Sequence, residues 1–312
     1  MAETDVKVRC SAWAREVDLS PIGTIGSYRG YLLVETPLPW PRDVGEIPLL
    51  GPLGPRLAAS GLRLQALVPS SLDAGPEQRR VVLHSFGSGD TGFDGYRRNE
   101  TVAGRSLEEA VDRLIALAGG ATVDPGRAGS RVTDVLVCTH GRRDVCCGSQ
   151  GTDLALQLAA AGAPEDVHLW RTSHTGGHRF APTFIVLPQG TGWAFADTAL
   201  VGQVLDRSVP FADVAHHYRG CAGLAGPREQ ALEREVLLGT GWELLDRART
   251  AFLTGETTAD GGHVTRLEAG GDRWEAVVRP GRTLPVPDCM KPLSEAKKSE
   301  TEWVVSDLRG LS

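Results

Sequence analysis

The pattern of apolar and polar residues predicts a compact α/β unit over residues 131–208. Residues 132–137 form a short apolar run rich in valine, which indicates a buried strand that ends at Cys138. Residues 152–161 have the composition of a helix, and residues 167–172 alternate as a strand does. Cys138 is therefore expected at the end of a buried strand.

Two more strands and a helix complete this unit. Residues 183–187 and 192–196 flank a Pro–Gln–Gly–Thr turn and are predicted to form a hairpin. Asp197 is placed to cap a helix that ends near Asp206. The resulting order, β-α-β-β-β-α, is that of a thioredoxin-like sheet with one helix fewer.

The first 120 residues show the same order of elements. The pattern predicts strands at residues 31–36, 62–68, 81–85 and 95–98, and helices at residues 49–60 and 106–118. Ser106 and Glu109 form a capping box at the start of the second helix. We therefore expect an N-terminal thioredoxin-like copy, produced by duplication, that has no metal ligands. Pro125, Gly126 and Gly129 mark the linker after it.

The pattern changes after residue 208. Residues 216–220 and 227–253 are mostly helical in pattern, and residues 264–268 and 273–278 are predicted to pair as a hairpin. The last twenty residues are rich in Lys, Glu and Ser and are expected to be a solvated tail. The chain is thus expected to be an α/β protein in three parts, residues 1–125, 126–208 and 209–312, the last an α+β extension of helices, hairpin and tail.

Composition narrows the class of protein. The chain has 312 residues, 41% hydrophobic and 23% charged, which is typical of a soluble globular protein with a sizeable core. A net charge of −6 gives no support for nucleic acid or an anionic membrane as a partner. The chain has neither an apolar run long enough for a membrane span nor an N-terminal apolar segment typical of a secretory signal. A cytoplasmic protein is therefore expected.

The six cysteines are too few for a disulfide scaffold in a chain of this length. Cys138, Cys146 and Cys147 lie within ten residues of one another, which favours metal or redox chemistry. The other three are scattered and are expected to be small buried apolar residues: Cys10, Cys221 and Cys289.

Two motifs carry the candidate chemistry, CTHGRRDVCCG at residues 138–148 and SHTGGH at residues 173–178. Thiolates and neutral imidazoles bind soft and borderline metals. Both motifs follow adjacent predicted strands, so their side chains would converge at one end of the sheet. The candidate metal and cofactor ligands are Cys138, Cys147, His174 and His178.

The spacing of these ligands favours an iron–sulfur core over a zinc ion. Eight residues separate Cys138 from Cys147, whereas the cysteines of a structural zinc site usually lie two to four residues apart. A wider binuclear iron–sulfur core suits this spacing better, and Rieske centres show that histidines can replace two cysteines on such a core. Gly176 and Gly177 permit a tight loop between the histidines. A zinc site with the same four ligands remains the alternative.

These motifs resemble those of the sucrase/ferredoxin-like proteins, a branch of the thioredoxin-like ferredoxins. The C-x8-C pair corresponds to Cys138 and Cys147 with Gly148 following, and the HxGGH motif corresponds to residues 174–178. The resemblance implies a [2Fe–2S] cluster with two cysteines on one iron and two histidines on the other. It also implies that residues 126–208 are a thioredoxin-like ferredoxin domain.

Several other residues with possible chemistry accompany the predicted ligands in the sequence. Cys146 adjoins a ligand, and its side chain is expected to point the opposite way. His140 is expected to be solvent-exposed. Cations that could offset cluster charge or receive an acidic partner are Arg142, Arg143 and Arg179. His216 and His217 lie in a segment without a cysteine pair and are weak candidates.

The function that these features predict is electron transfer, in a carrier without a substrate of its own. Histidine ligands raise the reduction potential, and each imidazole can hold or release a proton at its outer nitrogen. Proton-coupled one-electron transfer with a reductase and an acceptor is therefore expected. The alternatives are a non-redox binding protein with a structural zinc site, and a thiol oxidoreductase that uses Cys146 and Cys147.

Overall fold

The two halves of one mixed sheet repeat the same order of elements. In a computed structural model, which describes residues 7–71, 73, 75–87, 92–118 and 132–311, nine strands pair in the order β10-β9-β8-β6-β7-β3-β2-β4-β5. In each half the first strand pairs parallel with the second and antiparallel with the third, which pairs with the fourth. The predicted α/β class is confirmed, and each half is consistent with a thioredoxin-like fold.

The predicted elements of both halves are present, with shifts at their ends. The first half consists of β2 (Gly30–Glu35), α2 (Leu53–Ala59), β3 (Leu62–Leu67), β4 (Arg80–Ser85), β5 (Arg97–Val102) and α3 (Leu107–Ala118). The second consists of β6 (Thr133–Cys138), α4 (Thr152–Ala161), β7 (Val167–Thr172), β8 (Phe184–Leu187), β9 (Thr191–Trp193) and α5 (Thr198–Asp206). Asp197 caps α5 as expected, accepting from the backbone N–H of Leu200. The proposed linker at Pro125, Gly126 and Gly129 lies outside the described residues.

The halves meet where β3 and β7 end. These two strands share a single antiparallel residue pair, Leu67 with Thr172, at the last residue of each. Ser173, just past β7, extends the junction through hydrogen bonds with the backbone of Ala66 and the side chain of Gln65. The ends of β3, β6 and β7 are therefore close together, and both cysteine and histidine motifs start there.

The segment after residue 208 differs from its predicted helical character. Residues 218–221 form strand β10 (Tyr218–Cys221), which pairs with β9 at the edge of the sheet. The Tyr218 ring packs against Trp193 of β9. This contact with a distant residue favours a strand, whereas the local sequence pattern favours a helix. Helix α7 (Pro227–Thr240) ends at Gly241, and residues 249–253 belong to strand β11 (Arg249–Thr257).

The predicted C-terminal tail is a strand. The expected hairpin is present as β12 (His263–Ala269) and β13 (Asp272–Val286), but β13 continues well beyond it and pairs along its length with β15 (Lys298–Leu311). Charged residues of β15 also make specific contacts with other segments. Glu302, for example, accepts hydrogen bonds from the Ser20 backbone and Arg282. The prediction of a solvated tail at the end of residues 209–312 is therefore wrong, because residues 298–311 pair with β13 as a strand.

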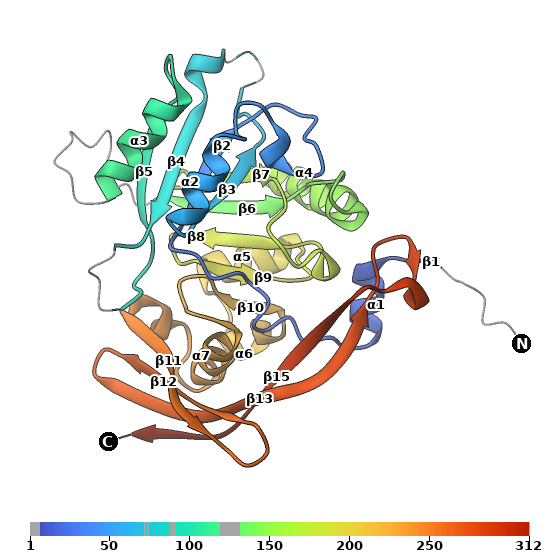
Figure 1. Cartoon of the computed structure of the whole chain (residues 1–312), viewed down its shortest axis with the longest axis vertical. Coiled ribbons are helices and arrows are strands. Elements are labelled where there is room, and N and C mark those ends of the chain that lie inside the picture. The colour runs from blue at the N-terminus through green and yellow to red at the C-terminus, as the bar shows by residue number, and fades with distance from the viewer. Residues whose placement is uncertain (1–6, 72, 74, 88–91, 119–131, 312) are drawn as a thin grey trace, which may run out of the picture.

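The β13–β15 ribbon arcs beneath the α/β body, and the segment between its two strands lies beside β1 near the N-terminus (Figure 1). Strand β1 (Lys7–Val8) pairs with β14 (Lys291–Pro292), and helix α1 (Cys10–Glu16) follows β1 directly. The remaining short elements are η1 (Val44–Glu46), η2 (Pro76–Gln78), η3 (Cys147–Gly151), η4 (His178–Phe180), α6 (Phe211–Val214), η5 (Ala215–His217), η6 (Trp242–Asp246) and η7 (Leu293–Glu295). Among the described helices, none has the length and apolar character needed to span a membrane.

Candidate metal centre

Three of the four predicted ligands converge. Cys138 ends β6, Cys147 begins η3, and His174 follows β7, and one ligand atom from each lies within 4.8 Å of the other two. Both thiols are fully buried. The junction of the half-sheets therefore gathers two sulfurs and an imidazole nitrogen that the sequence separates by up to 36 residues.

The fourth predicted ligand, His178, lies beside this group with other partners. Its ring centroid is 6.2 Å from that of His174. Its Nδ1 lies 3.0 Å from Asp144 Oδ2 and 3.3 Å from Cys10 Sγ. The His178 side chain is 20% exposed, so this histidine stands between the buried thiols and solvent.

The turn between the histidines depends on its two glycines. Gly176 and Gly177 have φ values of +86° and +66°, in the left-handed region that favours glycine. A Cβ on Gly177 would also lie 2.5 Å from a guanidinium nitrogen of Arg219. Arg219 is fully buried in β10 and donates to the carbonyl of Thr24, so it has little room to move.

Hydrogen bonds to its backbone hold His174 in place. Arg63 of β3 donates to the His174 carbonyl at 2.6 Å. The His174 N–H donates to Nδ1 of His140, whose Nε2 donates to the carbonyl of Pro41. The prediction that His140 is solvent-exposed is wrong. The side chain is buried, because its ring bridges these two backbone groups.

Hydrogen bonding between the two buried thiols shifts their pKa values in opposite directions. A hydrogen bond from the Cys147 thiol, aided by His174, holds the pKa of Cys138 well below its usual value despite burial. The same hydrogen bond, together with burial, raises the pKa of Cys147. Nδ1 of His174 is buried and has no hydrogen-bond partner among the described residues. A cation bound here would satisfy this nitrogen and hold both sulfurs as thiolates.

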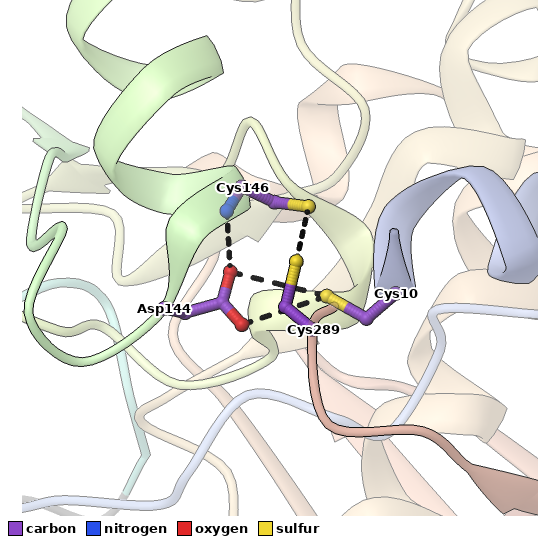
Figure 2. Close-up of side chains that lie close together, drawn as sticks. All are labelled: Cys10, Asp144, Cys146 and Cys289. Atoms are coloured by element: carbon purple, nitrogen blue, oxygen red, sulfur yellow. Dashed lines mark hydrogen bonds between the residues drawn. The ribbon is translucent and has the colours of Figure 1, made fainter. Parts of the chain in front are cut away.

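Cys146 belongs to a different group of side chains from Cys147, although the two residues lie in a helical turn and not on the extended backbone that the prediction assumed. It lies with Cys10, Asp144 and Cys289, whose ligand atoms are all within 4.8 Å of one another (Figure 2). Sequence analysis missed this group because its members are up to 279 residues apart along the chain. Cys221 does fit the expected buried role: burial raises its pKa to about 12, and its thiol donates to the Gln189 carbonyl.

A cavity of about 450 Å³ opens beside both groups. It is lined by Asp144, His174, His178 and Cys289, and by many cations. The cations are Arg42, Arg142, Arg143, Arg179, Lys291 and Lys298. Arg179 is paired with Glu300, whereas Arg142 and Arg143 lie on the exposed rim. His216 and His217 join no candidate ligand group in the described parts of the chain.

The fold and the site together define an α/β protein with buried cysteine and histidine groups suited to metal. A family model described as sucrase/ferredoxin-like matches residues 21–220, which is more than half of the chain, and the protein belongs to this family. No curated relative or solved structure shows significant similarity to the chain.

Proposed function

We propose that this protein is an electron carrier that holds a [2Fe–2S] cluster through Cys138, Cys147, His174 and His178. The observation that carries the proposal is the convergence of two buried thiols and the His174 ring within 4.8 Å. The spacing of the two motifs and the family resemblance support the binuclear cluster over a mononuclear ion.

The residues present suit such a group. Thiolate and imidazole are established ligands of binuclear iron–sulfur cores. The unpartnered Nδ1 of His174 is the kind of nitrogen that a metal would satisfy. Nδ1 of His178 already faces Asp144, which would leave Nε2 of this ring for iron.

The protein's own residues would control the proton and the access route. When bound, the cluster supplies one-electron transfer at a potential raised by its histidine ligands. His178 can hold a proton at Nδ1, shared with Asp144 Oδ2, or release it. Because His174 and His178 line the cavity, a partner could approach the histidine side while both thiols stay buried.

An acidic redox protein is the partner that this surface favours. The chain as a whole carries a net charge of −6, yet cations surround the mouth of the cavity beside the histidines. Such a local positive field would orient an acidic reductase or acceptor toward His174 and His178. The association should therefore weaken as salt is added.

The test is metal and sulfide analysis of protein purified without oxygen. We expect a coloured protein with about two iron and two acid-labile sulfide per chain. Cys147→Ser should lose most of both, while the matched control Cys221→Ser, at a buried thiol outside the site, should keep them. A colourless protein with zinc at these four ligands would instead support a structural, non-redox site and overturn the proposal.

A further inference from the structure

Three thiols and a carboxylate meet beside the proposed cluster site (Figure 2). Cys146 Sγ lies 3.1 Å from Cys289 Sγ, and Cys10 Sγ lies 3.6 Å from Asp144 Oδ2. Cys10 and Cys146 are fully buried and Cys289 is partly buried. Each of these sulfurs can act as a metal ligand, and so can the carboxylate, so the group is more than an apolar contact.

The loop backbone holds one oxygen of the carboxylate and leaves the other facing the neighbouring side chains. Oδ1 of Asp144 accepts from the backbone N–H groups of Cys146 and Cys147, at 2.9 and 3.2 Å. Oδ2 points the other way, toward Cys10 and His178. Asp144 is therefore oriented by the loop itself before any ion binds.

The separations suit a small tetrahedral ion. A zinc ion bound by sulfur at about 2.3 Å and oxygen at about 2.0 Å places its ligand atoms about 3.5 to 3.8 Å apart. The four ligand atoms here lie within 4.8 Å of one another, with closest separations of 3.1 and 3.6 Å. Small side-chain shifts would bring them to the tetrahedral arrangement.

The ligands come from three distant segments that other contacts already hold together. Cys10 begins α1, Asp144 and Cys146 precede η3, and Cys289 precedes β14. The β1–β14 pair and the hydrogen bond from Met290 N–H to the Val8 carbonyl fix the two outer segments beside each other. Asp144 and Cys289 also line the cavity, so the group is open to it.

We propose that Cys10, Asp144, Cys146 and Cys289 form a second metal site, for a thiophilic divalent cation of the Zn²⁺ class. On binding, the cation displaces the thiol protons to solvent and holds the sulfurs as thiolates. The site joins α1 and the segment before β14 to the loop that carries Cys147. Cys10 and Cys289 lie outside residues 21–220, so the family match does not cover the complete ligand set.

A disulfide between Cys146 and Cys289 would account for fewer of these contacts. It would consume two sulfurs, leaving the buried Cys10 thiol and Asp144 Oδ2 facing each other without a cation. It would also require an oxidant, whereas metal binding uses all four side chains at once.

The test is metal content and X-ray absorption of the full-length chain carrying Cys138→Ser, reconstituted with Zn²⁺ alone and then desalted. This substitution removes the proposed cluster ligand, so zinc that stays bound reports on the second site. We expect about one zinc per chain with about three sulfur ligands. The double variant Cys138→Ser/Cys289→Ser should lose that zinc, while Cys138→Ser/Cys221→Ser should keep it.

The outcomes separate this site from the proposed electron-transfer function. Cys10→Ser and Cys289→Ser in the otherwise unmodified protein should lower zinc and leave most of the iron. Zinc that is absent from Cys138→Ser, or that is unaffected by Cys289→Ser, would overturn the second site whatever the iron content. Peptide mapping without reductant that finds Cys146 covalently linked to Cys289 in freshly purified protein would also overturn it.

Discussion

Asp134 is a buried carboxylate in β6 that links the two halves of the sheet. It accepts hydrogen bonds from His84 and Arg98 of the first half and from Trp170 of the second, each at 2.7 Å. Burial alone would raise the pKa of Asp134, but hydrogen bonds from His168 and His84, together with Arg98, hold it well below the ordinary value. Asp134 is therefore ionised in the folded protein.

Replacing this carboxylate should destabilise the fold strongly. Asp134→Asn removes the buried one of the two carboxylates that pair with Arg98, a cation only 6% exposed, and leaves Glu100. We expect a loss of about 3 kcal/mol in the free energy of unfolding. Asp112→Asn, at an exposed pair with Arg56, should cost less than about 1 kcal/mol. Urea denaturation of both variants measures the difference, and equal losses would contradict the assigned role of Asp134.

The stabilisation by ionised Asp134 should also appear in the pH dependence of the free energy of unfolding. Because the pKa of Asp134 is lower in the folded than in the unfolded protein, its stabilisation is complete above the ordinary carboxyl pKa, about 4. It is lost as pH falls below that value toward the folded pKa. The free energy of unfolding of Asp134→Asn should therefore fall less steeply than that of the unmodified protein between neutral pH and about pH 3.

Gly177 should be the more sensitive of two glycines with similar backbone angles. Gly177→Ala meets both a positive φ of +66° and the buried Arg219 guanidinium. Gly104→Ala has a φ of +60° with open space around it and isolates the backbone cost, about 1 kcal/mol. We expect Gly177→Ala to cost at least twice as much and to lower iron content, measured by denaturation and by metal analysis. Equal losses of stability in the two variants would show that the Arg219 side chain moves away from the added methyl group without cost.

The start of α4 illustrates how an element positions the site. The helix begins at Thr152 as the sequence pattern indicated, and η3, a π-helical turn, leads directly into it. A Cβ on Gly151 would overlap the carbonyl oxygen of Cys138. The turn can therefore press against the end of β6 only because residue 151 is glycine, and this contact brings Cys147 beside Cys138.

Gly151→Ala should separate the two proposed thiolate ligands. We expect it to lower iron content several-fold and to cost more than about 2 kcal/mol in stability, since backbone must shift. Gly202→Ala, inside α5 with nothing near its missing Cβ, should instead stabilise by up to about 1 kcal/mol. Metal analysis and thermal unfolding of both variants test this. An unchanged iron content in Gly151→Ala would show that close packing at this residue does not position the ligands.

Elements with local signals were predictable, and those that depend on distant partners were not. The core strands β6 and β7 and the helix α5 follow from hydrophobic periodicity and from the Asp197 cap. Strand β15 has a polar, tail-like composition, and it forms because β13 supplies its hydrogen bonds. Strand β10 likewise depends on the free edge of β9.

That residues 126–208 form a separate domain stays a prediction. Contacts with other parts of the molecule argue against its independence. His174 depends on Arg63 of the first half, and Gly177 rests against Arg219 of β10. A fragment of residues 128–207 contains all four proposed ligands and neither arginine. A core of this size also has a small margin of stability.

We therefore expect this fragment to bind little iron compared with the full chain, despite its complete ligand set. Iron analysis and circular dichroism after anaerobic purification give the result. A folded and coloured fragment would show that the cluster domain is self-contained and that the arginine contacts are dispensable.

The sequence by itself determined the order of elements in both half-sheets and the residue types of the first candidate metal group. Periodicity and ligand chemistry are local properties, so they can be read without knowing which segments meet. Only the tertiary structure decided that the side chains of Cys10, Asp144, Cys146 and Cys289 lie together and that His178 faces Asp144. Cys10 and Asp144 are 134 residues apart, and no local pattern encodes a contact between segments so distant along the chain.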